Sequence, residues 1–330
     1  MNQMKFNAGI AGMGIYLPDK VLTNNDLEKM VDTSNEWIVA RTGIRQRRIA
    51  GDNEYTSDLA AKAAKSALED ANLMPEEVEL IIVATITADM YSPSTACIVQ
   101  HKIRAINAAA FDINSACSGF VYGLTIANQF IANGYYKNAL VIGAECLSKI
   151  TDWTDRNTCV LFGDGAGAVV LKRAEDGKGI LGTYLGADGS IGKHLTIPGL
   201  ALNQEEIAKR PSGNLRTIWM EGTEVFKFAV KVMPEAVLNV LDKAGLSIED
   251  VDGIIPHQAN LRIVDNAAKR LNIEKEKLYT NLQNYGNTSA ASIPIALYEA
   301  VKDGFVKKDD IIVLVGFGGG LTWASAVIKW

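Results

Sequence analysis

Cys117 has the surroundings in this sequence that best suit nucleophilic chemistry. It stands in the run Asp-Ile-Asn-Ser-Ala-Cys-Ser-Gly-Phe at residues 112–120, where an extended stretch gives way to a helical pattern of apolar residues over 118–131. Unpaired N–H groups and the positive end of the helix dipole favour a thiolate at such a position. The small neighbours leave room for a bulky acyl group. We therefore expect a nucleophile with a lowered pKa; a buried cysteine in a tight strand-to-helix turn is the alternative.

Two polar side chains and a glycine run could assist this thiol. His257 follows the apolar run 253–256, so a buried strand ends there in a polar loop, which is a typical place for a catalytic side chain in an α/β sheet. Asn287 stands in Tyr-Gly-Asn-Thr-Ser, where a turn followed by a helix cap is the simpler interpretation. The glycines of 316–320 can bring a main-chain N–H close to a substrate oxygen.

Short β-branched runs alternate with helical periods along the chain. Buried strands are expected at 80–86, 139–143, 167–171, 253–256 and 311–315, and amphipathic helices at 57–71 and 223–244. This alternation indicates a layered α/β fold.

The sequence also repeats itself. Residues 68–82 lie over 241–255 without a gap, and the helix and strand that follow in each half also match. We expect two duplicated halves, residues 1–175 carrying the cysteine and residues 176–330 carrying the histidine and asparagine. In this comparison Cys117 falls opposite Asn287, each just before its helix, with a ligand site between the halves.

Composition narrows the class of protein. A net charge of -5 over 330 residues, without a basic tail, argues against nucleic acid as a partner. No apolar run approaches the length that spans a membrane, and the first residues do not resemble a signal peptide. Four cysteines without CxxC spacing predict neither disulfides nor a metal site, so a cytoplasmic protein is expected.

Four motifs, in order, carry a resemblance to a known family. They are Ser-Ala-Cys-Ser-Gly at 115–119, Pro-His-Gln-Ala-Asn-Leu-Arg at 256–262, Tyr-Gly-Asn-Thr-Ser at 285–289 and Phe-Gly-Gly-Gly-Leu-Thr-Trp at 317–323. Together they closely resemble β-ketoacyl-acyl carrier protein synthase III, the condensing enzyme that initiates type II fatty acid synthesis. The likeness runs from Gly9 to Trp330. It implies a thiolase-like fold of two duplicated halves in α-β-α-β-α layers, a homodimer, and no cofactor beyond the CoA thioester substrate.

The resemblance implies a mechanism with named residues. Cys117 takes the acyl group from acyl-CoA, with its own main-chain N–H and that of Gly319 as the oxyanion hole. His257 and Asn287 then donate hydrogen bonds to the thioester carbonyl of malonyl-acyl carrier protein while it loses CO₂.

Binding residues are implied in the same way. The CoA contacts would be Trp37, Arg41, Arg156, Gly222, Phe226 and Asn260. The acyl pocket would be Ile86, Ser92, Leu147, Leu161 and Phe162. The contacts to the carrier protein would be Lys227 and Arg262.

Two positions depart from the family pattern. Ser92 stands where several relatives carry a phenylalanine that the dimer partner contributes to the acyl pocket, and Thr223 replaces a more usual asparagine. A smaller Ser92 enlarges the expected pocket, so the primer acyl group stays open among acetyl, branched and longer chains.

Other members of the fold are the competing hypotheses. Cys-His-Asn relatives that make secondary metabolites or long-chain ketones fit the same residues. Condensing enzymes with two histidines, and thiolases with a second cysteine near the C-terminal glycines, do not, because His101, His194 and Cys159 lie outside suitable motifs. A non-catalytic scaffold on this fold would not need Cys117, His257 and Asn287 together.

Overall fold

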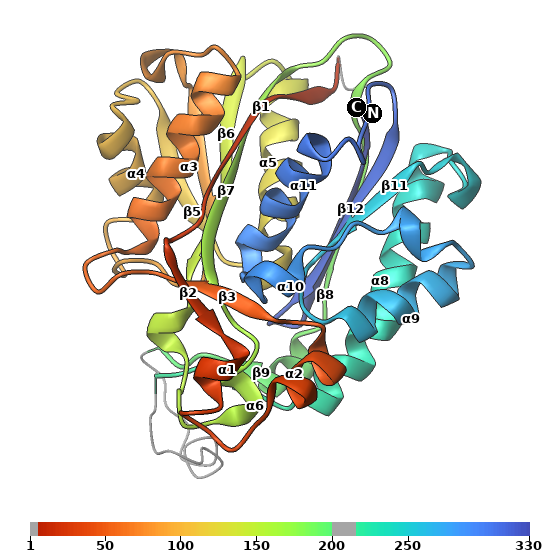
Figure 1. Ribbon diagram of the computed structural model, residues 1–330. Helices are drawn as coiled ribbons and strands as arrows, with labels where there is room; N and C mark the ends of the chain where they lie inside the picture. Colours follow the sequence, from red (N-terminus) through yellow and green to blue (C-terminus); the bar gives the residue numbers. More distant parts are fainter. Residues whose placement is uncertain (1–5, 200–215) are drawn as a thin grey trace.

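The computed structural model describes residues 6–199 and 216–330 (Figure 1). Residues 1–5, part of the segment compared above with a signal peptide, lie outside the described part. The strands are β1 (Ala8–Tyr16), β2 (Lys20–Thr23), β3 (Gln46–Ile49), β4 (Leu80–Ala84), β5 (Ala109–Ile113), β6 (Asn138–Cys146), β7 (Asp164–Arg173), β8 (Gly179–Ala187), β9 (Leu195–Thr196), β10 (Trp219–Met220), β11 (Gly253–Pro256), β12 (Ile311–Gly318) and β13 (Thr322–Lys329). The α-helices are α1 (Asn24–Leu27), α2 (Asn35–Thr42), α3 (Thr56–Asp70), α4 (Thr95–Ile103), α5 (Gly119–Ala132), α6 (Arg156–Cys159), α8 (Gly222–Ala244), α9 (Leu261–Leu271), α10 (Leu282–Tyr285) and α11 (Ser292–Lys302). Short 3-10 helices are η1 (Pro75–Glu77), η2 (Ala116–Ser118), η3 (Leu147–Ile150), η4 (Gly189–His194), η5 (Ile248–Asp250), η6 (Lys275–Lys277) and η7 (Ser289–Ala291).

The first large sheet has the strand order β1-β7-β6-β4-β5. β4 runs parallel to β5 and β6, and β7 runs antiparallel to β1 and β6. All nine residues of β6 are buried, which is expected of a central strand covered by helices on both faces.

The second large sheet repeats that order. It reads β8-β13-β12-β11, with β11 parallel to β12 and the other pairs antiparallel. A single parallel bridge between Ile254 and Leu278 stands where β5 stands in the first sheet. The repeat between residues 68–82 and 241–255 is therefore visible as repeated topology, while the boundary at residue 175 remains a prediction.

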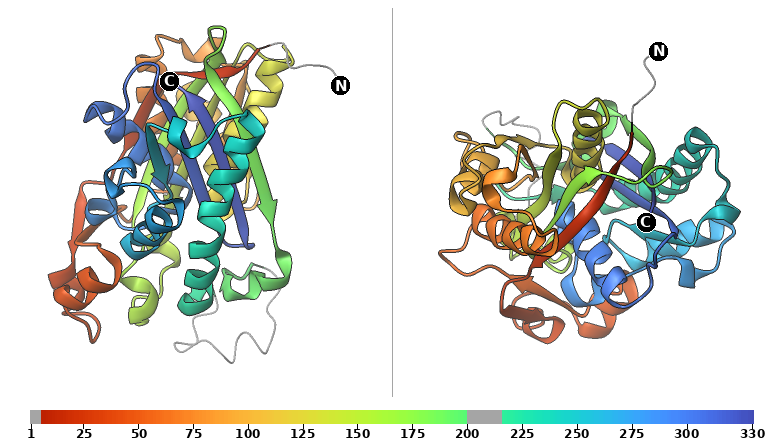
Figure 2. Two further views of the ribbon diagram at one scale, coloured as in Figure 1. Left: turned by 90° about the vertical axis from the view of Figure 1, so that its right-hand side faces the viewer. Right: turned by 90° about the horizontal axis from the view of Figure 1, so that it is seen from above.

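The two sheets and their helices form five layers (Figures 1 and 2). α3 and α4 pack on the outer face of the first sheet, and α8 and α9 on the outer face of the second. α5 and α11 lie between the sheets and share one core with the inner faces of both. The expected layered α/β fold is confirmed.

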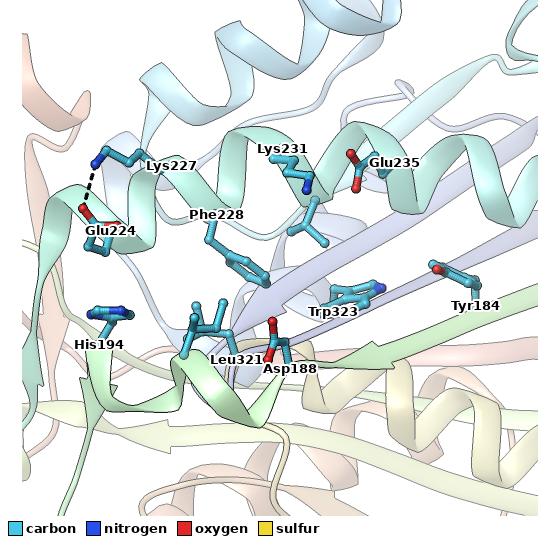
Figure 3. A pocket seen from close by; sticks show the side chains of 12 residues that line it. Tyr184, Asp188, His194, Glu224, Lys227, Phe228, Lys231, Glu235, Leu321 and Trp323 are labelled. Carbon is cyan, nitrogen blue, oxygen red and sulfur yellow. Dashed lines mark hydrogen bonds and ion pairs between the residues drawn. The ribbon is translucent and has the colours of Figure 1, made fainter.

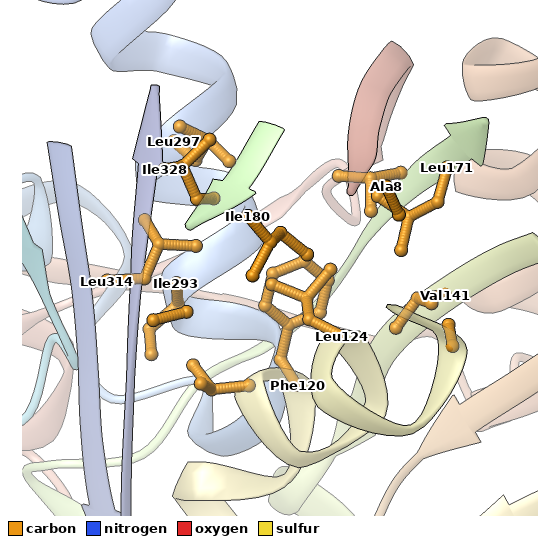
Figure 4. Close-up of a cluster of buried hydrophobic side chains, with 14 of the residues drawn as sticks. Ala8, Phe120, Leu124, Val141, Leu171, Ile180, Ile293, Leu297, Leu314 and Ile328 are labelled. Atoms are coloured by element: carbon orange, nitrogen blue, oxygen red, sulfur yellow. The ribbon is translucent and has the colours of Figure 1, made fainter. Parts of the chain in front are cut away.

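The helices of the central layer contribute large apolar side chains to this shared core (Figure 4). Phe120 and Leu124 of α5 pack with Val141 of β6 on one side, and Ile293 of α11 packs with Leu314 of β12 on the other. All five are fully buried. The starts of both central helices are thus held between two rigid sheets.

The predicted match of Cys117 with Asn287 is wrong at the helix starts. α5 and α11 each follow a 3-10 turn whose first residue has a positive φ, +46° at Ala116 and +48° at Ser289. α5 has 14 residues and α11 has 11, so a match anchored on their C-terminal glycines is three residues out of register at the start. Aligned on the turns, Cys117 corresponds to Ala290.

Within residues 6–199 and 216–330, no helix combines the length and the apolar character needed to cross a membrane.

Candidate active site

Cys117 lies in a tight turn between a strand and a helix. β5 ends shortly before it, and the 3-10 turn η2 leads directly into α5. The exposed fraction of Cys117 is 7%. Gly318 of β12 packs so closely that a Cβ there would stand 2.5 Å from the Cys117 main-chain nitrogen and 3.0 Å from its Cβ. The glycine run after the last parallel strand therefore makes room for the turn that holds the cysteine.

The expected lowering of the thiol pKa is wrong for the free protein. The pKa of Cys117 is raised to about 12, mainly by burial; a hydrogen bond with the Ser289 side chain lowers it, and the charge of Glu145 raises it. Desolvation of a thiolate in an apolar turn outweighs the favourable end of the helix dipole. At neutral pH the resting sulfur is a thiol, so its reaction needs a group that takes the proton.

His257 directly follows the parallel strand β11 and is buried, with 2% exposed. Its main-chain N–H donates to the carbonyl of Val315 at 2.8 Å, which extends the β11–β12 pairing by one residue. Its Nδ1 lies 2.6 Å from the hydroxyl of Ser292, and burial lowers the pKa of the imidazole to about 3. The ring is therefore neutral at physiological pH, with Nε2 available as a donor when Ser292 donates to Nδ1.

Asn287 is fixed by its main chain and by one side-chain bond. Its N–H donates to the carbonyl of Leu161 at 2.8 Å, and its carbonyl accepts from Gly163 at 3.0 Å. Its side-chain Oδ1 accepts the main-chain N–H of Ser289 at 2.8 Å. This bond places the amide oxygen toward the turn and leaves the Nδ2 donor for another acceptor.

Neighbouring residues bring the three groups to one junction. Ser289 hydrogen-bonds the Cys117 side chain through its hydroxyl and Asn287 through its main chain. His257 packs edge-on against Phe317, 5.3 Å between ring centroids, in the strand whose glycines contact Cys117. A thiol, a neutral imidazole and a carboxamide from both halves thus adjoin the starts of α5 and α11.

Gly319 borders the same turn. A Cβ added there would stand 3.5 Å from the Cβ of Ala116 and 3.5 Å from the carbonyl of Leu195. This position of Gly319 is compatible with a role in the oxyanion hole, and that role remains a prediction.

Four of the expected CoA contacts lie together. The guanidinium carbons of Arg156 and Arg41 stand 5.2 and 5.9 Å from the centroid of the Trp37 ring. Asn260 caps α9 and donates from Nδ2 to the carbonyl of Arg41 at 3.1 Å. A planar, cationic surface of this kind suits an adenine ring and phosphates.

The remaining expected contacts are divided between two faces of α8. Phe226 lies under the guanidinium of Arg262, 5.4 Å from ring centroid to Cζ, so a predicted CoA residue and a predicted carrier-protein residue touch. Lys227 pairs instead with Glu224 at 2.7 Å. Gly222 is the first residue of α8, with only the tip of Met220 close to the position of a Cβ.

Four of the five expected acyl-pocket residues share one apolar cluster. The cluster contains Ile86, Leu147, Leu161 and Phe162 together with Ile150, Leu195, Ile197 and Ile218. Ser92 is exposed and lies outside this cluster within one chain. Its predicted role depends on a second copy.

A pocket of about 380 Å³ lies away from the cysteine (Figure 3). It opens between α8, β8, η4 and β13, with Phe228 and Trp323 as its aromatic walls. Lys227 lines it, but Cys117, His257 and Asn287 do not. This pocket therefore does not coincide with the candidate site around Cys117.

Sequence reasoning missed Ser289 and Ser292, which bond the reactive groups, and Glu145, which bonds Ser289. Ser289 and Ser292 were interpreted only as part of a helix cap, although they bond Cys117 and His257. Glu145 was overlooked because it lies two residues beyond the end of the strand expected at 139–143. A charged residue in the buried strand β6 was a visible signal, because a buried carboxylate requires partners.

Comparisons with known proteins identify the family of the chain. The family described as 3-oxoacyl-[acyl-carrier-protein (ACP)] synthase III matches residues 111–189, and the family described as its C-terminal part matches residues 241–330. The chain is 62% identical over 326 residues to the beta-ketoacyl-[acyl-carrier-protein] synthase III of Caldanaerobacter subterraneus subsp. tengcongensis, covering 99% of this chain and 98% of that relative.

Solved structures extend the comparison to the fold. The 3-oxoacyl-[acyl-carrier-protein] synthase III of Aquifex aeolicus VF5 is 53% identical with a TM-score of 0.91, covering 98% of this chain and 100% of that one. The priming beta-ketosynthase from the R1128 polyketide biosynthetic pathway is 33% identical with a TM-score of 0.91, covering 100% and 97%. The resemblance drawn from the four motifs is confirmed: the chain belongs to the β-ketoacyl-[acyl-carrier-protein] synthase III family of condensing acyltransferases.

Proposed function

We propose that this chain condenses an acyl-CoA primer with malonyl-acyl carrier protein through an acyl-cysteine on Cys117. The observation that carries the proposal is the junction at which Ser289 joins the thiol to Asn287, while a neutral His257 packs on Phe317 of β12, the strand whose Gly316 and Gly318 pack on the Cys117 turn. The carrier protein and the ketoacyl product are inferred from the similar proteins, which are β-ketoacyl-[acyl-carrier-protein] synthases III.

In the first half-reaction the Cys117 sulfur attacks the thioester carbonyl of acyl-CoA. The carbonyl oxygen becomes an oxyanion, which the main-chain N–H groups of Cys117 and Gly319 would bind. Collapse of the intermediate expels the CoA thiolate and leaves a thioester on the enzyme. Each oxyanion donor is typically worth about 10²–10³ in rate.

In the second half-reaction the malonyl thioester loses CO₂. The electron pair of the broken C–C bond moves onto the thioester carbonyl as an enolate, where His257 Nε2–H and Asn287 Nδ2–H donate. A neutral imidazole suits this role, because it donates without needing to lose a proton. The carbanion then attacks the acyl-cysteine, expels the Cys117 thiolate and forms the β-ketoacyl product.

The binding roles belong to the same proposal. Trp37, Arg41, Arg156 and Asn260 hold the nucleotide end of CoA, Gly222 and Phe226 the pantetheine arm, and Lys227 and Arg262 the acidic carrier protein. Ile86, Leu147, Leu161 and Phe162, with Ser92 of a second copy, surround the acyl chain.

A homodimer fits the exposed edge of the first sheet. β5 is the terminal strand of that sheet, and the exposed apolar residues Met90, Tyr91 and Ile106 precede it in the chain. We place the reaction in the cytoplasm, because all four cysteines are free thiols and Cys97 is exposed. The proposal needs no metal or redox cofactor, since every step is a proton transfer, a displacement or a decarboxylation.

The test separates the two half-reactions. The protein is incubated with acetyl-, isobutyryl- and hexanoyl-CoA, and the adduct is located by peptide mass spectrometry before malonyl-acyl carrier protein is added. We expect the adduct on Cys117 and then a ketoacyl chain on the carrier protein. Cys117→Ser should abolish both, whereas Cys97→Ser, which removes an exposed thiol, should abolish neither. Acylation of wild type without any transfer to the carrier protein contradicts the proposal.

A secondary-metabolite role is the second candidate, favoured by the match to the R1128 priming ketosynthase. It predicts transfer of the acyl group to an acceptor other than the malonyl carrier protein of fatty acid synthesis. Parallel assays with malonyl-CoA and with that carrier protein distinguish the two candidates.

A further inference from the structure

Glu145 is a buried carboxylate beside the reactive turn, and the mechanism above leaves it unused. It belongs to β6, is 0% exposed, and has no ion pair with a cation among the described residues. Its Oε2 accepts the hydroxyls of Thr87 at 2.6 Å and Thr85 at 3.1 Å, and the main-chain N–H of Ile86 reaches both oxygens at 3.2 Å. Burying a carboxylate that only neutral donors satisfy costs free energy, so packing alone does not account for it.

The last contact of Glu145 leads to the cysteine. Ser289 donates its hydroxyl to Glu145 Oε1 at 3.1 Å, and the same hydroxyl hydrogen-bonds the Cys117 side chain. Ser289 is the first residue of η7, where its main chain has a positive φ of +48°. Sulfur, hydroxyl and carboxylate therefore form one continuous hydrogen-bonded line.

The duplication shows why a carboxylate fits at this point. β6 and β12 occupy the same place in their sheets. Gly143 of β6 packs on Ala290 of η7, much as Gly316 of β12 packs on Cys117 of η2. Two residues after Gly316, β12 has Gly318 against Cys117. Two residues after Gly143, β6 has Glu145. The equivalent turn of the second half, η7, carries no nucleophile. The Glu145 carboxyl group of β6 lies beside this turn and bonds Ser289.

We propose that Glu145, acting through the Ser289 hydroxyl, accepts the Cys117 thiol proton when the sulfur attacks acyl-CoA. This inference rests on the proposed function. Glu145 is a positioning residue in this scheme, because it does not touch the reacting sulfur, and Ser289 is the group that does.

The proton count balances over both half-reactions. The thiol proton passes to Ser289 Oγ while the Ser289 proton passes to Glu145, so the sulfur attacks as a thiolate. The CoA sulfur leaves as a thiolate and takes a proton from water. Glu145 keeps its proton through the acyl-enzyme stage and returns it through Ser289 when the carbanion expels the Cys117 thiolate.

Charge favours this transfer over simple ionisation of the thiol. A thiolate beside an ionised Glu145 would put two negative charges in one buried site, which each disfavours in the other. Moving the proton along the line shifts one negative charge and creates none. Burial raises the pKa of Glu145 to about 7, so the carboxylate can both accept and release a proton near neutral pH. The other titratable group that it faces is the Cys146 thiol, whose pKa burial also raises, so that thiol does not compete as an anion.

The test measures single-turnover acetylation of Cys117 by intact mass, from weakly acidic to alkaline pH. Variants are Glu145→Gln and Ser289→Ala, with Ser325→Ala as the matched control, because Ser325 is equally buried and its hydroxyl donates to Ala236 at 2.7 Å, outside the line. We expect both test variants to acetylate about 10²-fold more slowly near neutral pH, the lower range for a proton-transfer group. Their rates should keep rising into alkaline pH, whereas the wild-type rate levels off once Glu145 is ionised.

Three readouts distinguish a proton path from a purely structural role of these side chains. The double variant should be no slower than the slower single one, because both act on one proton path. Malonyl decarboxylation should stay within about threefold of wild type in all variants, since its donors are His257 and Asn287. Wild-type rates and pH profiles in the test variants, an equal loss in Ser325→Ala, or parallel loss of decarboxylation and thermal stability would each overturn the inference. Wild type that forms no acetyl-cysteine would instead contradict the proposed function.

Discussion

His257 Nδ1 lies 2.6 Å from the hydroxyl oxygen of Ser292, the first residue of α11. The same hydroxyl oxygen accepts the main-chain N–H of Gln258 at 3.4 Å. A hydroxyl that accepts from this N–H has its own proton free for the imidazole nitrogen. Ser292 therefore favours the tautomer in which Nε2 carries the proton, which is the donor that decarboxylation needs.

Ser292→Ala should slow decarboxylation more than acylation. The variant loses the buried hydrogen bond between Ser292 and His257, worth about 1 kcal/mol, and with it the preference for one tautomer. The rate of malonyl decarboxylation should therefore fall roughly five- to tenfold. Acetyl transfer from acetyl-CoA to Cys117 should change little, because His257 serves the second step. Release of ¹⁴CO₂ from malonyl-acyl carrier protein and single-turnover acetylation give the two rates. Equal losses in both would show that Ser292 supports the fold and not the tautomer.

The neutral His257 also predicts how stability depends on pH. Burial lowers its pKa from 6.5 to about 3, so between these values the unfolded chain binds a proton that the native chain does not. The contribution to stability is complete above pH 6.5 and is lost as pH falls toward 3, by about 1.4 kcal/mol per pH unit. Glu145 has the opposite sign, because its pKa is raised from 4.5 to about 7 and its contribution is lost as pH rises through that range.

Comparison with His257→Asn isolates the histidine, since Glu145 is present in both proteins. The stability advantage of wild type over the variant should be about 2 kcal/mol smaller at pH 5 than at pH 7, measured by urea unfolding. An advantage that does not change with pH would mean that the imidazole titrates normally in the native state.

The layered fold was predictable because its buried strands are apolar runs of strand length. β11 spans Gly253–Pro256, as expected from the pattern alone. β6 extends to Cys146, beyond the expected end at residue 143, because Glu145 interrupts the apolar run. The partners of that carboxylate, Thr85, Thr87 and Ser289, come from distant parts of the chain, so the local sequence signals an unusual charge but does not identify what it bonds.

The site was predictable in its residues and less so in its electrostatics. A helix start beside small residues located Cys117, but local sequence carries no measure of burial, and burial raises the thiol pKa. The register between α5 and α11 was misjudged because their C-terminal ends are alike while their lengths differ. Ser289 was interpreted only as a cap residue. Its bond to Cys117 joins the two halves of the chain, so no local sequence pattern indicates it.

Gly318→Ala should block acylation by steric pressure on Cys117. The added Cβ would stand 2.5 Å from the Cys117 main-chain nitrogen, so the turn must move. Displacement by a fraction of an ångström to 1 Å at a reacting atom predicts about a 10²-fold loss of acylation rate. Gly189→Ala is the matched control, because no atom lies within 4 Å of a Cβ at that position. A variant that is acetylated at the wild-type rate would show that the turn adapts without displacing the sulfur.

Trp37→Ala should weaken the use of CoA esters without harming the chemistry. Removing the ring beneath Arg156 and Arg41 takes away stacking worth about 1–2 kcal/mol, which predicts a rise of roughly tenfold in KM for acetyl-CoA with kcat largely kept. Acetyl-pantetheine lacks the nucleotide and serves as the control substrate, with equal kcat/KM expected in both proteins. Arg156→Lys, which keeps the charge but not the planar group, should show a smaller rise. Equal losses with both substrates would place Trp37 in the support of the fold.

Ser92→Phe should narrow the range of primers. Ser92 is exposed in one chain. The rest of the expected pocket is the apolar cluster of Ile86, Leu147, Leu161 and Phe162. The effect therefore requires a dimer that brings Ser92 of one copy to the pocket of the other. A phenylalanine there would remove space for several methylene groups, each worth about 0.8 kcal/mol when buried, so kcat/KM for hexanoyl-CoA should fall at least tenfold relative to acetyl-CoA. Ser92→Ala removes the hydroxyl without adding bulk and separates polarity from size. An unchanged ratio of kcat/KM across chain lengths in a protein shown to be dimeric by light scattering would exclude Ser92 from the acyl pocket.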